Sequence, residues 1–430
     1  MEAVVVRTIG ELIQDTRRAL DMTLTQLSEL SGVPRGTISR IENGEVKRPE
    51  FSSVHPLAMT LNIPFETLID YYVEVEKRSD SLLHILQSTI QQESSIELIR
   101  KVATKFLESP NQDSFDLTQK LYQSIDSVDN TSVQLSLYNL IIDYSRSHGI
   151  MPYIARGMYQ RYLIERNDFS KLKETYYSGK YILHYADFLP QQERVELYYK
   201  LGIHAHNLKL YNESIEHCKK VLAEDDGSSY YRVHSLGVLR DAFFGLGKYE
   251  ESEMYSLQYK EFNYPNIREN TVLMEALINA KKGNTDQTIQ QLLSFLTSCS
   301  NDSAIPATNQ LLRLYIQQNN FEGAKALLES SKINPSTINK SNPLICSRYA
   351  DYLQVQGEYY LAIGDYEKCV SYLIEGALHY SKINDTSEEK KCLNMVIRNL
   401  LEQNVTVYKS TLEKLSAYYN HSIKETEVSA

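Results

Sequence analysis

Residues 23–51, TLTQLSELSGVPRGTISRIENGEVKRPEF, decide the fold of the N-terminal part of the chain. Thr23 and Gln26 have the spacing of a capping box, in which a hydroxyl and an amide three residues apart satisfy free backbone N–H groups at a helix start. The short helix that follows, over 24–30, ends at Gly32. This glycine supplies the backbone freedom that a tight turn needs.

A further short helix follows the turn. Pro34 stands at its start, where a missing N–H costs nothing, and Asn43-Gly44 ends it. Upstream, apolar residues at helical spacing predict a first helix between Ile9 and Leu20. Two short helices joined by a glycine-containing turn predict a helix-turn-helix.

Residues 7–72 resemble the five-helix DNA-binding domain of phage-repressor and Xre-type regulators. The string I-S-R-I-E-N-G after G-V-P carries the resemblance, together with LAMTLNIPFETLI over 57–69. Arg17 and Glu42 match an ion pair of that family, which implies a structural role for Glu42. One position departs from the family: Leu24 stands where a glutamine usually touches DNA, so that contact is lost.

The start of the third helix is the part that reaches base edges in the major groove. Two arginines there have the geometry for bidentate contacts to guanine, and the residues after the helix suit phosphate contacts. The candidate base-reading residues are Arg35, Gly36, Thr37, Ser39 and Arg40. The candidate phosphate-contacting residues are Asn43, Lys47 and Arg48.

Charge restricts DNA contact to a small area. The chain has 45 Lys and Arg against 55 Asp and Glu, a net charge of −10, so nonspecific polyanion binding by the whole surface is not expected. Residues 35–48 hold four basic and two acidic residues, a local net charge of +2. One copy should bind weakly, so we expect a dimer on two related half-sites. The alternative is a vestigial packing module.

A repeat recurs beyond residue 150. Each repeat has a helix, a short polar turn, usually an aromatic residue just after the turn, and a second helix. These turn positions are 36 to 45 residues apart, at 169, 211, 249, 285, 321 and 366. The pattern resembles the tetratricopeptide repeat, whose usual period is about 34 residues.

We therefore predict an all-α protein of three parts. Residues 1–72 form a five-helix helix-turn-helix domain, and 73–150 form a helical linker with degenerate first repeats. Residues 151–430 form a right-handed superhelix of tetratricopeptide-like helix pairs that binds a peptide and dimerises. Such pairs stack because one pair alone cannot bury its apolar face.

The family pattern places the first helix of each pair on the concave inner side, where it lines a groove for an extended peptide. Asparagine donates to and accepts from a peptide backbone at once, arginine holds a carboxylate, and acidic residues hold a basic group. The alternative for each is a solvated polar residue on an open face. The candidate peptide-binding residues are Arg161, Tyr199, His206, Asn207, Asp241, Lys281, Asn309, Arg313 and Glu358.

Signals of catalysis, cofactors and metals are missing from the sequence. It contains no G-x-x-x-x-G-K, H-E-x-x-H or G-x-S-x-G motif. His204 and His206 lie two apart on one predicted helix and do not share a face. We therefore expect no catalytic residue, no metal and no cofactor. The five cysteines are far apart and are expected to be reduced thiols.

No apolar run reaches the roughly 20 residues of a membrane helix, and the start MEAVVVRTIGE is not a secretion signal. We expect a cytoplasmic protein without membrane contact. The segment from Leu393 to Tyr419 is apolar at helical spacing. It predicts a cap for the last repeat, either alone or combined with a dimer contact.

An Xre-type domain joined to tetratricopeptide-like repeats resembles the Rap/Rgg/NprR/PlcR/PrgX group, quorum-sensing regulators of Gram-positive bacteria, and most of all its NprR and PlcR branches. The resemblance implies a non-enzymatic homodimer, or higher oligomer, that binds double-stranded operator DNA and is switched by a short imported signalling peptide. It also implies an alternative function, in which the protein binds a response regulator and either promotes its dephosphorylation or sequesters it. This function could stand alone or be combined with transcriptional regulation. In the phosphatase, Gln87, Gln91 or Gln92 would orient a water. A third hypothesis is a pure protein-interaction scaffold.

Overall fold

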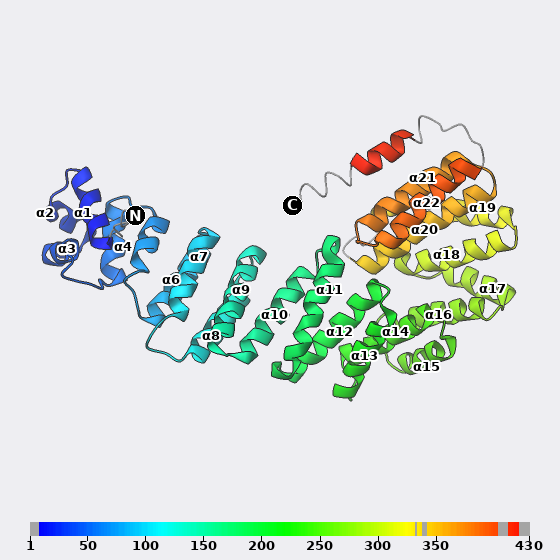
Figure 1. Ribbon diagram of the computed structural model, residues 1–430, viewed down its shortest axis with the longest axis horizontal. Coiled ribbons are helices and arrows are strands. Elements are labelled where there is room, and N and C mark those ends of the chain that lie inside the picture. The colour runs from blue at the N-terminus through cyan, green and yellow to red at the C-terminus, as the bar shows by residue number, and fades with distance from the viewer. Residues whose placement is uncertain (1–7, 332, 338–341, 403–411, 421–430) are drawn as a thin grey trace. The chain divides into compact units, whose positions relative to one another are not determined.

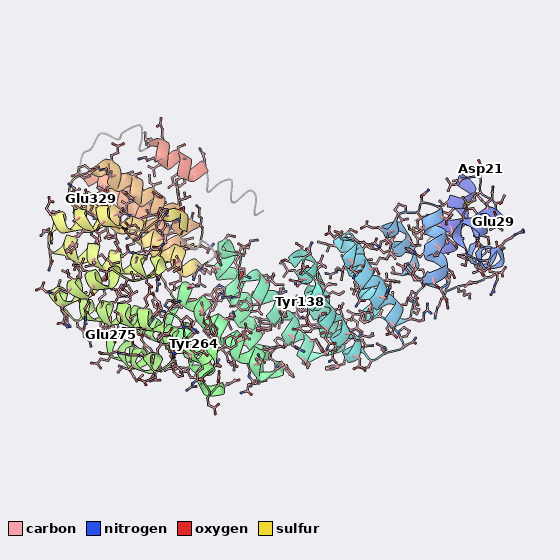
Figure 2. All side chains as sticks on the ribbon, turned by 180° about the vertical axis from the view of Figure 1, so that it is seen from behind. Asp21, Glu29, Tyr138, Tyr264, Glu275 and Glu329 are labelled. Carbon is pink, nitrogen blue, oxygen red and sulfur yellow. The ribbon has the colours of Figure 1, made fainter. Side chains whose placement is uncertain are left out.

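A computed structural model describes residues 8–331, 333–337, 342–402 and 412–420 (Figures 1 and 2). Across these ranges the chain forms helices and turns and no strand, which confirms the all-α prediction. The chain divides into two compact units. Unit 1 comprises residues 1–164 and 184–188, and unit 2 comprises residues 165–183 and 189–430.

Unit 1 begins with the five predicted helices of the helix-turn-helix bundle. The capping box is formed: Gln26 N donates to Thr23 Oγ1 at 3.2 Å, and Thr23 N donates to Gln26 Oε1 at 2.8 Å. Gly32 follows the second helix with φ 75°. Pro34 precedes the third helix rather than beginning it. The five helices are α1 (Ile9–Ala19), α2 (Leu24–Ser31), α3 (Arg35–Glu42), α4 (Phe51–Thr60) and α5 (Phe65–Tyr72).

The rest of unit 1 packs onto this bundle. A single apolar core contains buried side chains from Ile9 to Tyr153. Ion pairs also join the end of the bundle to α7: Lys101 Nζ lies 2.7 Å from Asp70 Oδ1 and 3.0 Å from Glu74 Oε1. The helices are α6 (Ser79–Gln91), α7 (Ile96–Leu107), α8 (Ser114–Ser124), the 3-10 helix η1 (Ile125–Ser127), α9 (Thr131–His148) and α10 (Met151–Glu165).

Unit 2 is an array of helix pairs (Figure 1). Each of the six predicted turn positions is the first residue of a helix, so the repeat register is confirmed over this unit. Its elements are η2 (Phe169–Lys171), α11 (Leu172–Tyr181), α12 (Gln191–Asn207), α13 (Tyr211–Glu224), α14 (Tyr230–Gly245), α15 (Tyr249–Lys260), α16 (Ile267–Lys281), α17 (Thr285–Leu296), α18 (Asn301–Gln317), α19 (Phe321–Ser330), η4 (Pro335–Thr337), α20 (Pro343–Ala362), α21 (Tyr366–Ser381) and α22 (Thr386–Glu402). The 3-10 helix η3 (Ile182–Phe188) has its first two residues in unit 2 and the rest in unit 1.

Small residues set the spacing within each pair. A Cβ on Gly202 of α12 would lie 2.6 Å from Cys218 Sγ on α13, so only glycine permits this approach. The residue three positions after each turn position is buried, and all but the first of the six are small: Leu172, Ser214, Ser252, Thr288, Ala324 and Cys369. Ser214 Oγ donates to Gly202 O at 2.8 Å, and Ser252 Oγ donates to Arg240 O at 2.9 Å in the next pair.

The last helices of unit 2 return to the first. Asn384 Nδ2, after α21, donates to Ser170 O at 2.8 Å. Lys209 Nζ, after α12, lies 2.9 Å from Asp385 Oδ2, and Leu172 packs into the core that α21 and α22 share. The end of the array therefore contacts its beginning. The first helices of the successive pairs are α12, α14, α16, α18 and α20.

The C-terminal segment is described only in part. Val396 on α22 and Tyr418 in the helix over 412–420 are buried, which fits a capping role. Leu412 and Tyr419 are exposed, while Val407 lies outside the described residues. None of the described helices is long and apolar enough to cross a membrane.

Candidate functional site

The eight candidate DNA-contacting residues lie on α3 or in the loop after it. Six of them are exposed, and Thr37 and Ser39 are half-buried. Ile38 and Ile41 are buried on the opposite face of the helix and fix it to the bundle. The structure therefore presents one polar face of α3 to solvent, as a recognition helix requires.

A buried ion pair fixes α3 against α1. Arg17 Nε donates to Glu42 Oε1 at 2.8 Å, and Arg17 Nη2 donates to Glu42 Oε2 at 2.7 Å, so the contact is bidentate. Arg17 Nη1 also donates to Met22 O at 2.7 Å. The hydrogen bonding of Arg17 to the carboxylate of Glu42 is the main cause that raises the pKa of Arg17. The predicted structural role of Glu42 is thus met.

Gly10 is a position that the sequence reasoning missed. A Cβ on Gly10 of α1 would lie 2.2 Å from the backbone oxygen of Ile41 on α3. Glycine is therefore required for the close approach of these two helices. Its signal in the sequence is faint, since one glycine inside a helical pattern has no single interpretation.

The surface around α3 is weakly basic. Arg40 Nε lies 3.8 Å from Glu45 Oε2, and the two side chains are 65% and 58% exposed. An exposed pair at this distance contributes little, so Arg40 remains available to a partner. Asp21 and Glu29, labelled in Figure 2, are exposed acidic residues beside and on α2.

A polar hub joins the bundle to α6. Glu76 is buried and accepts from Arg78 Nη2 at 2.9 Å and from Tyr72 Oη at 3.0 Å. Burial acts to raise the pKa of Glu76, but the hydrogen bonds from Arg78 and from nearby backbone and side-chain donors outweigh it and lower the pKa to about 2.

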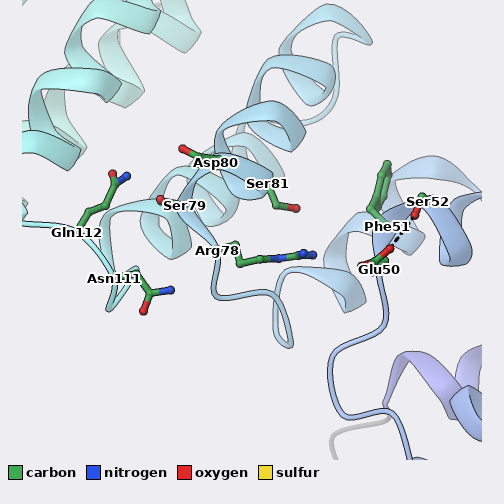
Figure 3. Close-up of a pocket in the computed structure, with 9 residues that line it drawn as sticks. All are labelled: Glu50, Phe51, Ser52, Arg78, Ser79, Asp80, Ser81, Asn111 and Gln112. Carbon is green, nitrogen blue, oxygen red and sulfur yellow. Dashed lines mark hydrogen bonds between the residues drawn. The ribbon is translucent and has the colours of Figure 1, made fainter.

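A cleft of about 530 Å³ lies beside this hub (Figure 3). It is lined by the start of α4, the start of α6, and the loop before α8. Its residues are Glu50, Phe51, Ser52, Arg78, Ser79, Asp80, Ser81, Asn111 and Gln112. Arg78 is already held by Glu76, so the cleft offers no unpaired cation.

The first helices of unit 2 bring polar residues together from separate repeats. We call this set the polar cluster; its members are His206 on α12, Arg240 and Asp241 on α14, Asn309 and Arg313 on α18, and Arg348, Asp351 and Glu358 on α20. Five of the nine candidate peptide-binding residues belong to it. His206 and Arg348, which are 142 positions apart in the sequence, therefore belong to one cluster.

Direct bonds join α18 to α20 within the cluster. Arg313 Nη2 lies 2.7 Å from Asp351 Oδ1, and Arg313 Nη1 lies 3.2 Å from Glu358 Oε2. Asn309 is buried, and its Nδ2 donates to Asp351 Oδ2 at 3.0 Å and to Arg348 O at 3.3 Å. Its Oδ1 is buried with no hydrogen-bond partner. Arg313 is thus already neutralised, and Asn309 has one unused acceptor.

The remaining members meet through their charges. Arg240 Nη2 on α14 lies 2.7 Å from Asp241 Oδ1. Burial lowers the pKa of His206; Asp241 opposes this effect, while Arg348 and Arg240 add to it. Arg348 in turn interacts electrostatically with Asp241, Arg240 and Asp302. Residues from α12 and α14 therefore lie close enough to α20 for their charges to interact.

Arg240, Arg348 and Asp351 are members that the sequence reasoning missed. Arg348 and Asp351 stand one helical turn apart on α20, before the predicted Glu358. That i, i+3 spacing on the first helix of a pair is the signal that would have found them.

Four candidate peptide-binding residues lie elsewhere. Arg161 belongs to unit 1, where its Nη1 donates to Asn139 Oδ1 at 3.1 Å. Tyr199 is buried against Tyr231, with ring centroids 5.4 Å apart. Lys281 is exposed at the end of α16, and Asn207 is half-buried at the end of α12.

The remaining residues singled out in the sequence are placed as follows. Gln87, Gln91 and Gln92 are exposed near the end of α6. His204 is buried and its Nε2 lies 2.8 Å from Leu172 O. No group of three His, Cys, Asp or Glu side chains in the described part of the chain is placed to hold a metal ion. The five cysteines form no disulfide.

Sequence comparisons concern the N-terminal domain. A helix-turn-helix family model matches residues 13–68. The uncharacterised HTH-type transcriptional regulator RghRB of Bacillus subtilis is 38% identical over 60 residues, 14% of this chain and 43% of that protein. The HTH-type transcriptional repressor RghR of the same species is 38% identical over 64 residues, 15% of this chain and 47% of that protein. The chain thus matches less than half the length of these relatives.

Two solved structures align with this chain at low sequence identity. A signal-transduction ATPase of the STAND class with a tetratricopeptide-repeat sensor, from Pyrococcus horikoshii, aligns over 98% of this chain and 66% of that one, with 13% identity and a TM-score of 0.46. PlcR of Bacillus thuringiensis, in complex with the peptide PapR7 and DNA, aligns over 75% of this chain and 95% of that one, with 15% identity and a TM-score of 0.26.

These observations give the order of the parts along the chain. An Xre-type helix-turn-helix domain is followed by an array of helix pairs.

Proposed function

We propose that this chain is a cytoplasmic transcriptional regulator that binds operator DNA through α3 as a dimer and is switched by a short peptide bound at the polar cluster. The observation that carries the proposal is the coexistence of two features in one chain. In unit 1 the arginines of α3 are exposed on its polar face, and in unit 2 polar residues from four first helices lie together. A scaffold alone would need no exposed recognition helix.

The DNA contact follows from the exposed face of α3. Arg35 and Arg40 read guanine edges through bidentate hydrogen bonds, each worth about 1–3 kcal/mol of discrimination. Lys47 and Arg48 contact phosphates and set the register. The local charge of +2 over 35–48 gives a small salt-dependent contribution per copy, so two copies on an inverted repeat supply the affinity.

The peptide contact follows from the chemistry of the polar cluster. An extended peptide carries backbone donors and acceptors, and leaving one buried without a partner costs about 1–3 kcal/mol. The unused Oδ1 of Asn309 accepts a backbone N–H. The charged members of the cluster select the charges of the peptide.

Coupling requires that the helix-turn-helix domain does not move alone. The core shared from Ile9 to Tyr153 and the ion pairs of Lys101 make the bundle and α6–α9 one body. A peptide that prefers one state of unit 2 then changes which dimer geometry is populated, and with it the fit to two half-sites. Such coupling typically amounts to about 1–3 kcal/mol.

The experiment for the DNA part is an in vitro selection. The full chain is incubated with random 40-base-pair duplexes, and bound DNA is sequenced over successive rounds. We expect an enriched inverted repeat with wild type and relaxed preference at one base pair per half-site with Arg40→Ala. Arg100→Ala, which removes an exposed arginine of α7, serves as the matched control and should enrich the wild-type sequence. Absence of any enriched sequence with wild type contradicts the proposal.

A further inference from the structure

The polar cluster is not uniform in charge along α20. At one end, Arg313 lies between Asp351 and Glu358, so two carboxylates face one guanidinium, a local net charge of −1. At the other end stands Arg348. In the described part of the chain no carboxylate lies within ion-pair distance of Arg348, and no side chain accepts a hydrogen bond from it.

The surroundings of Arg348 explain why none of the described carboxylates pairs with it. Asp241 is the nearest candidate on α14, but it is held by Arg240 at 2.7 Å. Asp302 on α18 interacts with Arg348 only through its field. The arginine is half-buried inside unit 2, and a guanidinium has five donors. An arginine enclosed by other helices and without an acceptor is a costly arrangement unless a ligand completes it.

A second observation concerns Asn309, which contacts the backbone of Arg348. Asn309 is 4% exposed, and its Nδ2 binds the backbone oxygen of Arg348 itself. Its Oδ1 is buried without a partner. A buried acceptor without a partner therefore lies on a side chain that contacts the backbone of Arg348. A peptide terminus, which has both a carboxylate and a neighbouring backbone N–H, satisfies both groups.

We infer that Arg348 binds a carboxylate of the peptide, and that Asp351 and Glu358 bind a basic group of the same peptide toward its amino end. This inference rests on the proposed function of the polar cluster as a peptide site. It assigns the direction of the peptide along α20 and a requirement for charge at both ends.

The length of the peptide follows from the helix. Arg348 and Glu358 are ten residues apart on α20, which corresponds to about 15 Å at the rise of an α-helix. An extended chain covers about 3.3–3.6 Å per residue, so about four or five residues span the two ends. The ligand class is therefore a tetra- or pentapeptide with an acidic and a basic end.

The test begins with affinity selection from a library of random pentapeptides with free termini. The full chain is mixed with the library, separated from unbound peptide by size exclusion, and the retained peptides are sequenced by mass spectrometry. The tightest peptide is then titrated calorimetrically in three forms. One form is unmodified, one is amidated at its C-terminus, and one has its Asp and Glu replaced by Asn and Gln.

With wild type we expect one of the two altered peptides to bind at least tenfold more weakly, because a charge-assisted hydrogen bond is lost. The amidated form identifies the terminal carboxylate as the source, and the other form identifies a side chain. Arg348→Ala should lose the same factor with the unmodified peptide and nothing more with the weakened one, as coupled partners do in a double-mutant cycle. Arg348→Lys should be intermediate. Arg268→Ala, an exposed arginine on α16, is the matched control and should bind as wild type.

The outcomes separate the two claims. If peptides are selected but neither Arg348→Ala nor loss of a carboxylate weakens them, the assignment of Arg348 is wrong and the peptide-binding function stands. The assignment is also wrong if Arg348→Ala and removal of the peptide carboxylate each weaken binding and the combined effect is the product of the two factors, because Arg348 and the carboxylate are then not partners. If no peptide is retained by wild type, the inference falls together with the proposed function. Melting curves of each variant confirm that affinities compare folded proteins.

Discussion

Replacing Glu42 by alanine should loosen the recognition helix far more than any neighbouring charge change. The carboxylate of Glu42 accepts two short hydrogen bonds from Arg17, and the two side chains are 2% and 11% exposed. Removing one partner of a buried pair leaves the other charge uncompensated, which typically costs about 3–5 kcal/mol. Arg17 retains its bond to Met22 O, so we expect the lower end, about 3 kcal/mol.

Glu45→Ala is the matched control, because it removes the same side chain from a second Arg–Glu pair of the same domain. The atoms of that pair are 3.8 Å apart, and both side chains are more than half exposed. Exposed pairs contribute about 0–1 kcal/mol. Two substitutions of one residue type, three positions apart, should therefore differ several-fold in their effect on stability.

Hydrogen exchange read by mass spectrometry measures this effect locally in the full chain. Protection of the amides of α1 and α3 should fall about 150-fold in Glu42→Ala, since every 1.4 kcal/mol is a factor of ten, and no more than about fivefold in Glu45→Ala. Protection in α20 should not change in either variant. Equal protection of α1 and α3 in the two variants would refute the reasoning that burial decides the value of this ion pair.

Three further results are expected. Arg40→Ala should cost about 1–3 kcal/mol on the selected operator and relax one base position, whereas Lys47→Ala should weaken all sequences alike and reduce the salt dependence; fluorescence anisotropy at several salt concentrations separates the two. Burial lowers the pKa of His204 and of His217 to about 4, whereas an unfolded histidine has a pKa of about 6.5. The neutral histidines therefore contribute their full stabilisation above pH 6.5, and this stabilisation is lost as the pH falls toward 4. The melting temperature should therefore drop between pH 7 and pH 5, and a variant with both histidines changed to glutamine should show a smaller drop; an equal drop would exclude them as the cause. Asn309→Ala should lower the melting temperature by an amount corresponding to about 1–3 kcal/mol, because the buried Nδ2 donates two bonds to α20; an unchanged melt would show that these bonds contribute nothing.

Local signals in the sequence were sufficient for most of the fold. The Thr23–Gln26 capping box and Gly32 mark the ends of α2 because capping and left-handed backbone depend only on neighbouring residues. The six turn positions mark helix starts for the same reason. Pro34 lies one residue before α3, within the usual uncertainty of helix boundaries.

The two candidate sites differ in how far local sequence patterns predict them. The exposed face of α3 follows from helical periodicity around Ile38 and Ile41, so its residues were predictable. The polar cluster depends on which side chains of different repeats meet, and no local pattern states this. Arg313 has the charge and the hydrogen-bond donors expected of a ligand-binding residue. It is nevertheless neutralised by Asp351 on α20, which lies 38 residues further along the sequence. Arg348 could not be predicted as a candidate, because the side chains that surround it are determined by the packing of the whole array.

The most direct test of the account is the affinity of the full chain for its selected operator with and without a saturating concentration of a peptide selected from the pentapeptide library. Fluorescence anisotropy with labelled operator gives both dissociation constants under one salt condition. The account predicts that they differ by at least fivefold, in either direction, since allosteric coupling of about 1–3 kcal/mol corresponds to 5–150-fold. Arg348→Ala should bind operator like wild type without peptide, and its response should need at least tenfold more peptide to reach half its maximum. Identical dissociation constants with and without bound peptide would contradict the central claim, because a ligand that binds both states equally shifts neither.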